Sequence, residues 1–146
     1  MGAGIMPEPH TRELKMIAGP DVATQALDFV ADACQAWGVG DAARFDILLA
    51  VDEAVSNIVN HGYPAAGGPI TLRIWRQARA IHIELVDRGI TFDPATAAAP
   101  KLSGPLAQRA IGGLGLYLMR QVMDDVRYEH GARGNVLQLI KQEAVA

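Results

Sequence analysis

The sequence has little cysteine, few aromatic residues and no basic run, and each shortage excludes a class of protein. Its 146 residues include one cysteine, so an internal disulfide and a cysteine-based zinc cluster are excluded. Aromatic residues make up only 5% of the chain, which favours an aliphatic core of helices packed on a sheet. Thirteen Lys and Arg residues against sixteen Asp and Glu residues give a net charge of −3, so nucleic acid is not an expected partner.

Long apolar runs are also missing. No stretch approaches the roughly 18 apolar residues of a membrane span, and the first residues lack the charged region of a secretory signal. We therefore expect no membrane partner and a cytoplasmic location. Half of the residues are hydrophobic, enough for one core. We expect a flexible tail over residues 1–10, which contains Pro7 and Pro9, followed by a single domain over residues 11–146.

Two kinds of reactive side chain are expected to be structural. Cys34 lies in a helix-like, alanine-rich stretch, which predicts inert packing. The histidines have no metal-like partner three or four residues away, and structural roles are expected for all of them: His10, His61, His82 and His130.

Hydrophobic periodicity predicts the order β-α-α-β-β-α-β-β. The expected elements are a strand at 14–18, a helix that starts at 19–21 and stops at Gly38, a helix from about Ala42 to about His61 capped by Asp41, strands at 70–74 and 81–85, a helix at 114–123, and strands at 126–128 and 136–141. Because the strands alternate between polar and apolar residues, the order predicts an α+β fold, a two-layer sandwich with its helices on one face of the sheet.

The second helix carries a polar stripe of Asp46, Glu53, Asn57 and Asn60 opposite its apolar side. A solvent-facing stripe is the ordinary interpretation, and it remains open for Asp46 and Asn60. The stripe has no cation, however, and it includes asparagine, which is a poor helix former. Glu53 and Asn57 are four residues apart and project side by side, so their oxygens can address one ion or one water network.

Two further segments carry candidate site residues. Asp87 ends an apolar strand, so it is either a turn former or a buried acceptor for an exocyclic amine such as that of adenine, with Gly89 allowing a flat base to approach. The glycine-rich stretch at 111–116 precedes a helix and is either a hinge or a phosphate cradle. It has neither the Walker nor the Rossmann pattern.

These segments in this order, with Gly134-Asn135 in the last hairpin, resemble the GHKL ATPases of gyrase, heat-shock protein 90 and histidine kinases. Within that superfamily the chain is most similar to the small bacterial serine/threonine kinases that act as anti-sigma factors. The resemblance covers about residues 11–141 and is strongest at 49–64, 86–94 and 113–124. It implies the Bergerat fold, a two-layer sandwich with a mixed, mostly antiparallel sheet.

The resemblance also implies a role for each site residue. Glu53 matches the general base, Asn57 the Mg²⁺ ligand and Asp87 the carboxylate that reads adenine. The remaining matches are Gly89 beside the base, and Gly113, Leu114, Gly115 and Leu116 beside the phosphates. Residues at about 95–112 match the ATP lid, and the sequence departs from the family pattern at Thr91, where a second glycine is common.

The function implied is that of an ATP- and Mg²⁺-dependent serine/threonine kinase. It would phosphorylate an anti-anti-sigma partner with a STAS domain, can sequester a sigma factor, and would form a homodimer. Two alternatives stay open. One is an ATP-gated protein-binding module without phosphotransfer, and the other is an interaction domain without a nucleotide.

Overall fold

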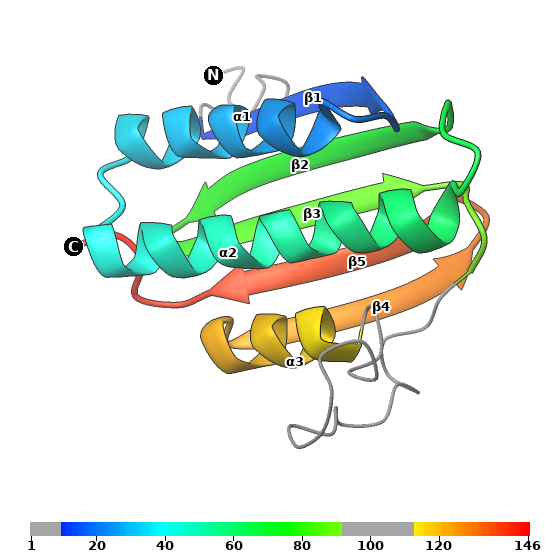
Figure 1. Cartoon of the computed structure of the whole chain (residues 1–146). Coiled ribbons are helices and arrows are strands. Elements are labelled where there is room, and N and C mark those ends of the chain that lie inside the picture. The colour runs from blue at the N-terminus through cyan, green and yellow to red at the C-terminus, as the bar shows by residue number, and fades with distance from the viewer. Residues whose placement is uncertain (1–9, 92–112) are drawn as a thin grey trace.

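The structure is a computed structural model that describes residues 10–91 and 113–146. In chain order its elements are β1 (Thr11–Ile17), α1 (Val22–Ala36), α2 (Asp41–Asn57), the π-helical turn η2 (Ile58–Gly62), β2 (Pro69–Gln77), β3 (Ala80–Asp87), α3 (Gly113–Val122), β4 (Asp125–Gly131) and β5 (Gly134–Lys141). Figure 1 shows α2 lying between α1 and α3 over the strands. The predicted order of strands and helices is confirmed.

The described strands form one five-stranded sheet in the order β1-β2-β3-β5-β4, and all four pairings are antiparallel. β5 lies between β3 and β4 because the chain returns from α3 along the sheet edge as β4 and then turns inward. The register of β3 and β5 pairs Asp87 with Asn135. The end of β3 and the start of β5 therefore meet at one end of the sheet.

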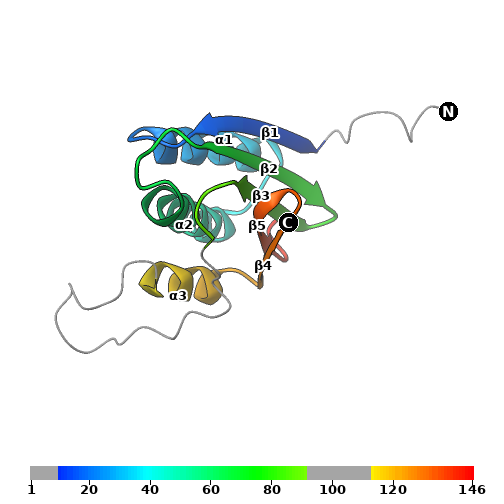
Figure 2. The same cartoon turned by 90° about the vertical axis from the view of Figure 1, so that its right-hand side faces the viewer.

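The helices form a single layer on one face of the sheet, as Figure 2 shows end-on. Strand alternation produces this arrangement. In β1, Met16 is buried under the helices whereas Glu13 and Lys15 are exposed. The largest fully buried side chains are all aliphatic or methionine: Ile47, Ile70, Leu72, Ile74, Ile81, Ile83, Leu85, Met119, Leu139, Val30, Val51 and Val55. The prediction of an aliphatic core between helices and sheet is confirmed.

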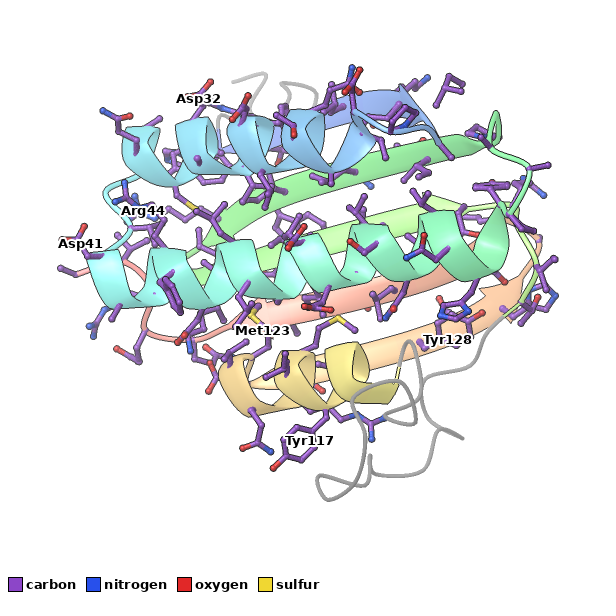
Figure 3. The ribbon with its side chains drawn as sticks, viewed as in Figure 1. Asp32, Asp41, Arg44, Tyr117, Met123 and Tyr128 are labelled. Carbon is purple, nitrogen blue, oxygen red and sulfur yellow. The ribbon has the colours of Figure 1, made fainter. Side chains whose placement is uncertain are left out.

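The start of α2 differs from the prediction. The sequence predicts Asp41 as the cap, but α2 begins at Asp41 itself, and Gly40 occupies the cap position in an extended conformation. Asp41 makes no capping hydrogen bond. Its carboxylate lies in the first turn, where it interacts favourably with the helix dipole, and it pairs with Arg44 at 3.6 Å at this end of α2 (Figure 3).

The second helix also ends differently from an ideal helix. Its regular part stops at Asn57, and η2 continues it as one wider π turn in which Tyr63 N donates to Ile58 O at 3.1 Å. The helical stretch thus reaches the region where the sequence predicts a break, near His61. Because π turns widen a helix locally and recur at functional sites, the end of α2 is a place to look for function.

Cys34 is packed as predicted. Cys34 is fully buried, and burial raises the pKa of its thiol to about 11. The tail is shorter than predicted on the described side: the His10 carbonyl accepts from Arg76 N at 2.9 Å, and its ring packs edge-on against Trp37. The rest of the predicted tail, residues 1–9, lies outside the described residues. Of the described helices, none is both long and apolar enough to span a membrane.

Candidate functional site

Asp87 ends β3 and is buried, with 7% of its surface exposed. Its Oδ1 accepts two hydrogen bonds, one from Gly89 N and one from Asn135 Nδ2, both at 2.9 Å. Its Oδ2 accepts none from any described residue. One oxygen of this aspartate therefore stabilises the turn, and the other remains open as an acceptor.

Gly89 is required where the chain leaves β3. A side-chain carbon at this position would lie 2.5 Å from Gly62 O and 2.6 Å from Gly62 C, so the two backbones touch. A hydrogen bond from Ile90 N to Gly62 O, 2.9 Å long, stabilises this contact. The wide turn η2 and the exit from β3 thus form one continuous surface beside Asp87. The sequence predicts the need for a glycine here, but not the backbone that it meets.

Gly134 brings β5 equally close to β3. It has a φ of 101°, and a side-chain carbon there would lie 2.4 Å from Asp87 O. This approach sets Asn135 opposite Asp87 in the sheet, with 3% of its surface exposed. Gly134-Asn135 contributes to the family resemblance without a role assigned to it, and the structure shows that the side chain of Asn135 donates a hydrogen bond to Asp87.

A cavity opens where these pieces meet α2 and α3. Its volume is ≈ 40 Å³, and it is lined by Ala54, Asn57, Ile58, Gly62, Asp87, Ile90, Met119, Tyr128, Asn135 and Leu137. By this measure it has room for roughly three water molecules, so a larger ligand would extend through its mouth. Apolar walls with a few convergent polar groups are typical of a binding site for a small molecule or cofactor.

Asn57 and Asp87 line the same cavity, although 30 residues of sequence separate them. Asn57 is half-buried, and its side chain makes no hydrogen bond to any described residue. Its amide oxygen therefore remains free to bind a ligand. No group of three or more His, Cys, Asp or Glu side chains that could hold a metal occurs within residues 10–91 and 113–146. A Mg²⁺ ion fits such a site, because it prefers one or two protein oxygens together with phosphates and waters.

Glu53 lies one turn before Asn57 and is not part of the cavity wall formed by the described residues. It is half-buried and makes no hydrogen bond or ion pair with another described residue. Burial raises the pKa of Glu53 above its ordinary value of 4.5, and the negative charge of Asp52 raises it further. A carboxylate in this state is a stronger base than an exposed one.

The predicted phosphate residues are described only in part. The backbone of Gly113, Leu114, Gly115 and Leu116 forms the first turn of α3, but their side chains lie outside what the structure describes. The predicted lid at 95–112 lies wholly outside the described residues. Further along α3, Met119 lines the cavity and Met123 points toward α2 in Figure 3. The start of a helix exposes backbone N–H groups that suit phosphate.

Comparison with known proteins identifies the family. A model of the family described as the histidine kinase-like ATPase domain matches residues 17–141. The chain therefore belongs to the histidine kinase-like ATPase domain family. The predicted two-layer fold agrees with this assignment. In the solved structure of the RsbU and RsbW domains of Rv1364c from Mycobacterium tuberculosis, a similar fold matches 93% of this chain and 33% of that one, with a TM-score of 0.67 and 20% identity.

Two curated relatives indicate which class of protein within this family the chain resembles. The chain is 36% identical over 105 residues to the serine/threonine-protein kinase BtrW of Bordetella bronchiseptica, a match covering 69% of this chain and 72% of BtrW. It is 31% identical over 106 residues to the serine-protein kinase RsbW of Bacillus mycoides, covering 68% of this chain and 66% of RsbW. The predicted class, a serine/threonine-protein kinase with a GHKL-type ATPase domain, is confirmed by these relatives.

Proposed function

We propose that this protein uses ATP and Mg²⁺ to phosphorylate a serine or threonine of a small protein partner. The observation that carries the proposal is the cavity between α2, η2, β3 and β5. It brings the open Oδ2 of buried Asp87 and the unbonded amide of Asn57 together from distant parts of the sequence.

Asp87 reads the adenine base in this proposal. An ionised carboxylate only accepts hydrogen bonds, so its open oxygen takes one from the exocyclic amine of adenine. The side chains of Met119 and Leu137 supply apolar surface for the flat ring, and the bare backbone at Gly62 and Gly89 lets the ring lie close to the chain.

Asn57 holds Mg²⁺ through its amide oxygen, and the first turn of α3 at Gly113, Leu114, Gly115 and Leu116 donates backbone N–H groups to the phosphates. The bound ion supplies positive charge against the phosphate oxygens. α2 and α3 pack beside each other, which supports a role for both helices in binding one nucleotide.

Glu53 acts as the general base. Its carboxylate takes the proton from the attacking hydroxyl, the hydroxyl oxygen forms a bond to the γ-phosphorus, and the bond to the β,γ-bridging oxygen breaks, which releases ADP. The products are a phosphoserine or phosphothreonine and ADP. A raised pKa suits this role, because the carboxylate is then a better proton acceptor.

The partner in this proposal is an anti-anti-sigma protein with a STAS domain, and the chain also sequesters a sigma factor as a cytoplasmic homodimer. The family resemblance supports this set of partners, and the relatives BtrW and RsbW are named as serine or serine/threonine kinases. The homodimer has a direct test. Sedimentation equilibrium should give twice the 15.6 kDa of one chain, and a mass of one chain would contradict it.

The kinase proposal is tested by transfer of labelled γ-phosphate from ATP to a candidate STAS partner. Glu53→Gln should retain ATP binding and lose transfer. Because burial disfavours the charged form of Glu53, this variant should unfold at a temperature no lower than the parent protein, so loss of activity cannot be ascribed to misfolding. Transfer at the parental rate would contradict the base assignment.

Asn57→Ala provides the matched test of the metal ligand. It should weaken Mg²⁺-dependent ATP binding by at least about tenfold and leave Mg²⁺-free nucleotide binding unchanged. Asn60→Ala, three residues further along and exposed, serves as the control. Equal loss of binding with and without Mg²⁺ would contradict the assignment.

The alternative is an ATP-gated binding module, and one observation favours it: Glu53 is absent from the cavity wall that the described residues form. In that case ATP orders the chain and creates or hides a surface for a partner. An ATP-dependent complex with the partner, without phosphoserine on it, would support the module over the kinase.

A further inference from the structure

Three hydrogen-bond donors from two segments converge on one oxygen, Asn135 Oδ1. Thr91 Oγ1 lies 3.1 Å from it, Tyr128 OH 3.0 Å and His130 Nδ1 2.8 Å. Thr91 belongs to the exit from β3, whereas Tyr128 and His130 belong to β4. Asn135 is buried in the middle of these donors, with 3% of its surface exposed.

The other end of the same amide faces two acceptors. Asn135 Nδ2 donates to Asp87 Oδ1 at 2.9 Å and to Gly89 O at 3.0 Å. A backbone carbonyl and an ionised carboxylate can only accept, so the group that faces them must be the NH₂. The amide therefore has a single favourable orientation, and the three donors on its oxygen oppose rotation.

We propose that Asn135, held by Thr91, Tyr128 and His130, is a positioning residue that determines which purine base the protein accepts. It does so by fixing the direction of the Asp87 carboxylate. With Oδ1 occupied by Asn135 Nδ2 and by Gly89 N, Oδ2 is the oxygen left to accept a hydrogen bond from a ligand. This inference rests on the proposed function, since it assigns a role in reading the base of the bound nucleotide.

The chemical consequence is discrimination between adenine and hypoxanthine. Adenine presents a donor, its 6-amine, and an acceptor at N1. Hypoxanthine presents an acceptor at O6 and a donor at N1. A fixed carboxylate oxygen placed for the 6-amine meets the O6 of hypoxanthine and repels it. A carboxylate freed from Asn135 can turn to accept from N1–H, so its preference for adenine should weaken.

The experiment compares the Kd of ATP with the Kd of inosine triphosphate, measured by calorimetry on the full chain. Asn135→Ala should weaken ATP binding by about tenfold or more and change inosine triphosphate binding far less, so the ratio of the two constants falls. A merely structural role would weaken both nucleotides alike and leave the ratio unchanged, which would overturn the inference.

Milder variants keep the test decisive if Asn135→Ala fails to fold. Thr91→Val and Tyr128→Phe each remove one donor to Asn135 Oδ1 and leave the bond to Asp87 in place. Each should reduce the ratio by a smaller factor, and the double variant should reduce it further. Gln138→Ala lies on the same strand but hydrogen-bonds Glu84, so it should leave the ratio unchanged.

A double-mutant cycle with Asp87→Asn completes the design. Because Asn135 acts through Asp87, Asn135→Ala should change the ratio little once Asp87 is replaced. Independent, additive effects of the two changes would contradict the positioning role.

The proposed function and the role of Asn135 can be tested separately. If the parent chain binds no ATP, the proposed function fails, whereas an unchanged ratio in a chain that binds ATP removes only the role of Asn135.

Discussion

At the scale of single residues, the polar stripe that runs from α2 into η2 divides into four different environments. Asn57 faces the cavity, whereas Asp46 pairs with Lys141 at 2.9 Å and is not a simple solvent-facing residue. Asn60 is exposed, as the ordinary interpretation of the stripe predicts. Glu53 is intermediate, half-buried and with a raised pKa. Residue type and helical position therefore predicted the polar stripe. The environment of each of its residues depends on the neighbouring elements.

The raised pKa of Glu53 predicts the pH dependence of phosphate transfer. A general base works as the carboxylate, so transfer should decline as pH falls through the pKa of Glu53, with a midpoint above 4.5. Asp52→Asn removes the neighbouring charge, so it should lower this pKa and move the midpoint to lower pH. The measurement is kcat against pH, with circular dichroism at each pH as the control for folding. A midpoint that is the same in both proteins would contradict the prediction.

At the scale of elements, the site depends on close contact between backbones. The turn η2 meets the exit from β3 at Gly62 and Gly89, and β5 meets the end of β3 at Gly134. These contacts hold the carboxylate of Asp87 against the end of α2. Tyr63 strengthens the junction, because its hydroxyl accepts from Arg88 N and donates to Pro69 O.

Gly89→Ala should therefore damage both stability and binding. The new carbon would lie 2.5 Å from Gly62 O, and rigid backbone on both sides must shift. We expect a loss of about 1–3 kcal/mol in the free energy of unfolding, together with weaker ATP binding. Gly131→Ala is the control, because nothing lies within 4 Å of the position. Equal stability of the two variants in urea unfolding would contradict this account.

The end of α3 is fixed by one lysine. Lys141 Nζ donates to Asp46 Oδ2 at 2.9 Å and to Val122 O at 2.6 Å, which joins β5, α2 and the last turn of α3. Its side chain is only 17% exposed. The lysine thus satisfies a helix-terminal carbonyl and a partly buried carboxylate at the same time.

Lys141→Met should destabilise the protein by about 1–3 kcal/mol, because both acceptors lose their partner. Glu143→Gln tests the contrast. This variant removes the ion pair between Arg79 and Glu143, whose side chains are 59% and 70% exposed, respectively. It should change the free energy of unfolding by less than about 0.5 kcal/mol. Calorimetric unfolding of both variants measures the difference. A larger loss of stability in Glu143→Gln than in Lys141→Met would show that burial does not determine how much these ion pairs contribute to the free energy of unfolding.

At the scale of the whole molecule, the described helices cover one face of an antiparallel sheet (Figure 2). The cavity is lined by residues of α2, η2, β3, α3, β4 and β5. In the proposed function, a nucleotide bound there contacts α2, β3 and α3 together. Binding should therefore stabilise the entire domain against unfolding rather than one element of it.

Mg-ATP at 100 times its Kd should add about 2.7 kcal/mol to the free energy of unfolding. For a chain of this length the melting temperature should rise by roughly 5–10 °C. Asp87→Asn should abolish most of the rise, and Mg²⁺ alone should not reproduce it. An unchanged melting temperature in the parent protein would instead support an interaction domain without a nucleotide.

The sequence by itself determined the order of elements, the aliphatic core and the side of α2 that carries its polar stripe. It could do so because strand alternation and helical spacing are local and repeat every two or 3.6 residues. Local signals were weaker at element ends, where Asp41 proved to lie inside α2 and the helix continued into a π turn.

Only the tertiary structure decided which of these residues meet. The pairing of Asp87 with Asn135 spans 48 positions, and it depends on the register of β5 between β3 and β4. The contact between Gly62 and Gly89 and the link from Lys141 to Asp46 depend in the same way on packing between elements. Periodicity reports which face of an element is buried. The partner on that face is set by sheet register and helix packing, which no single segment contains.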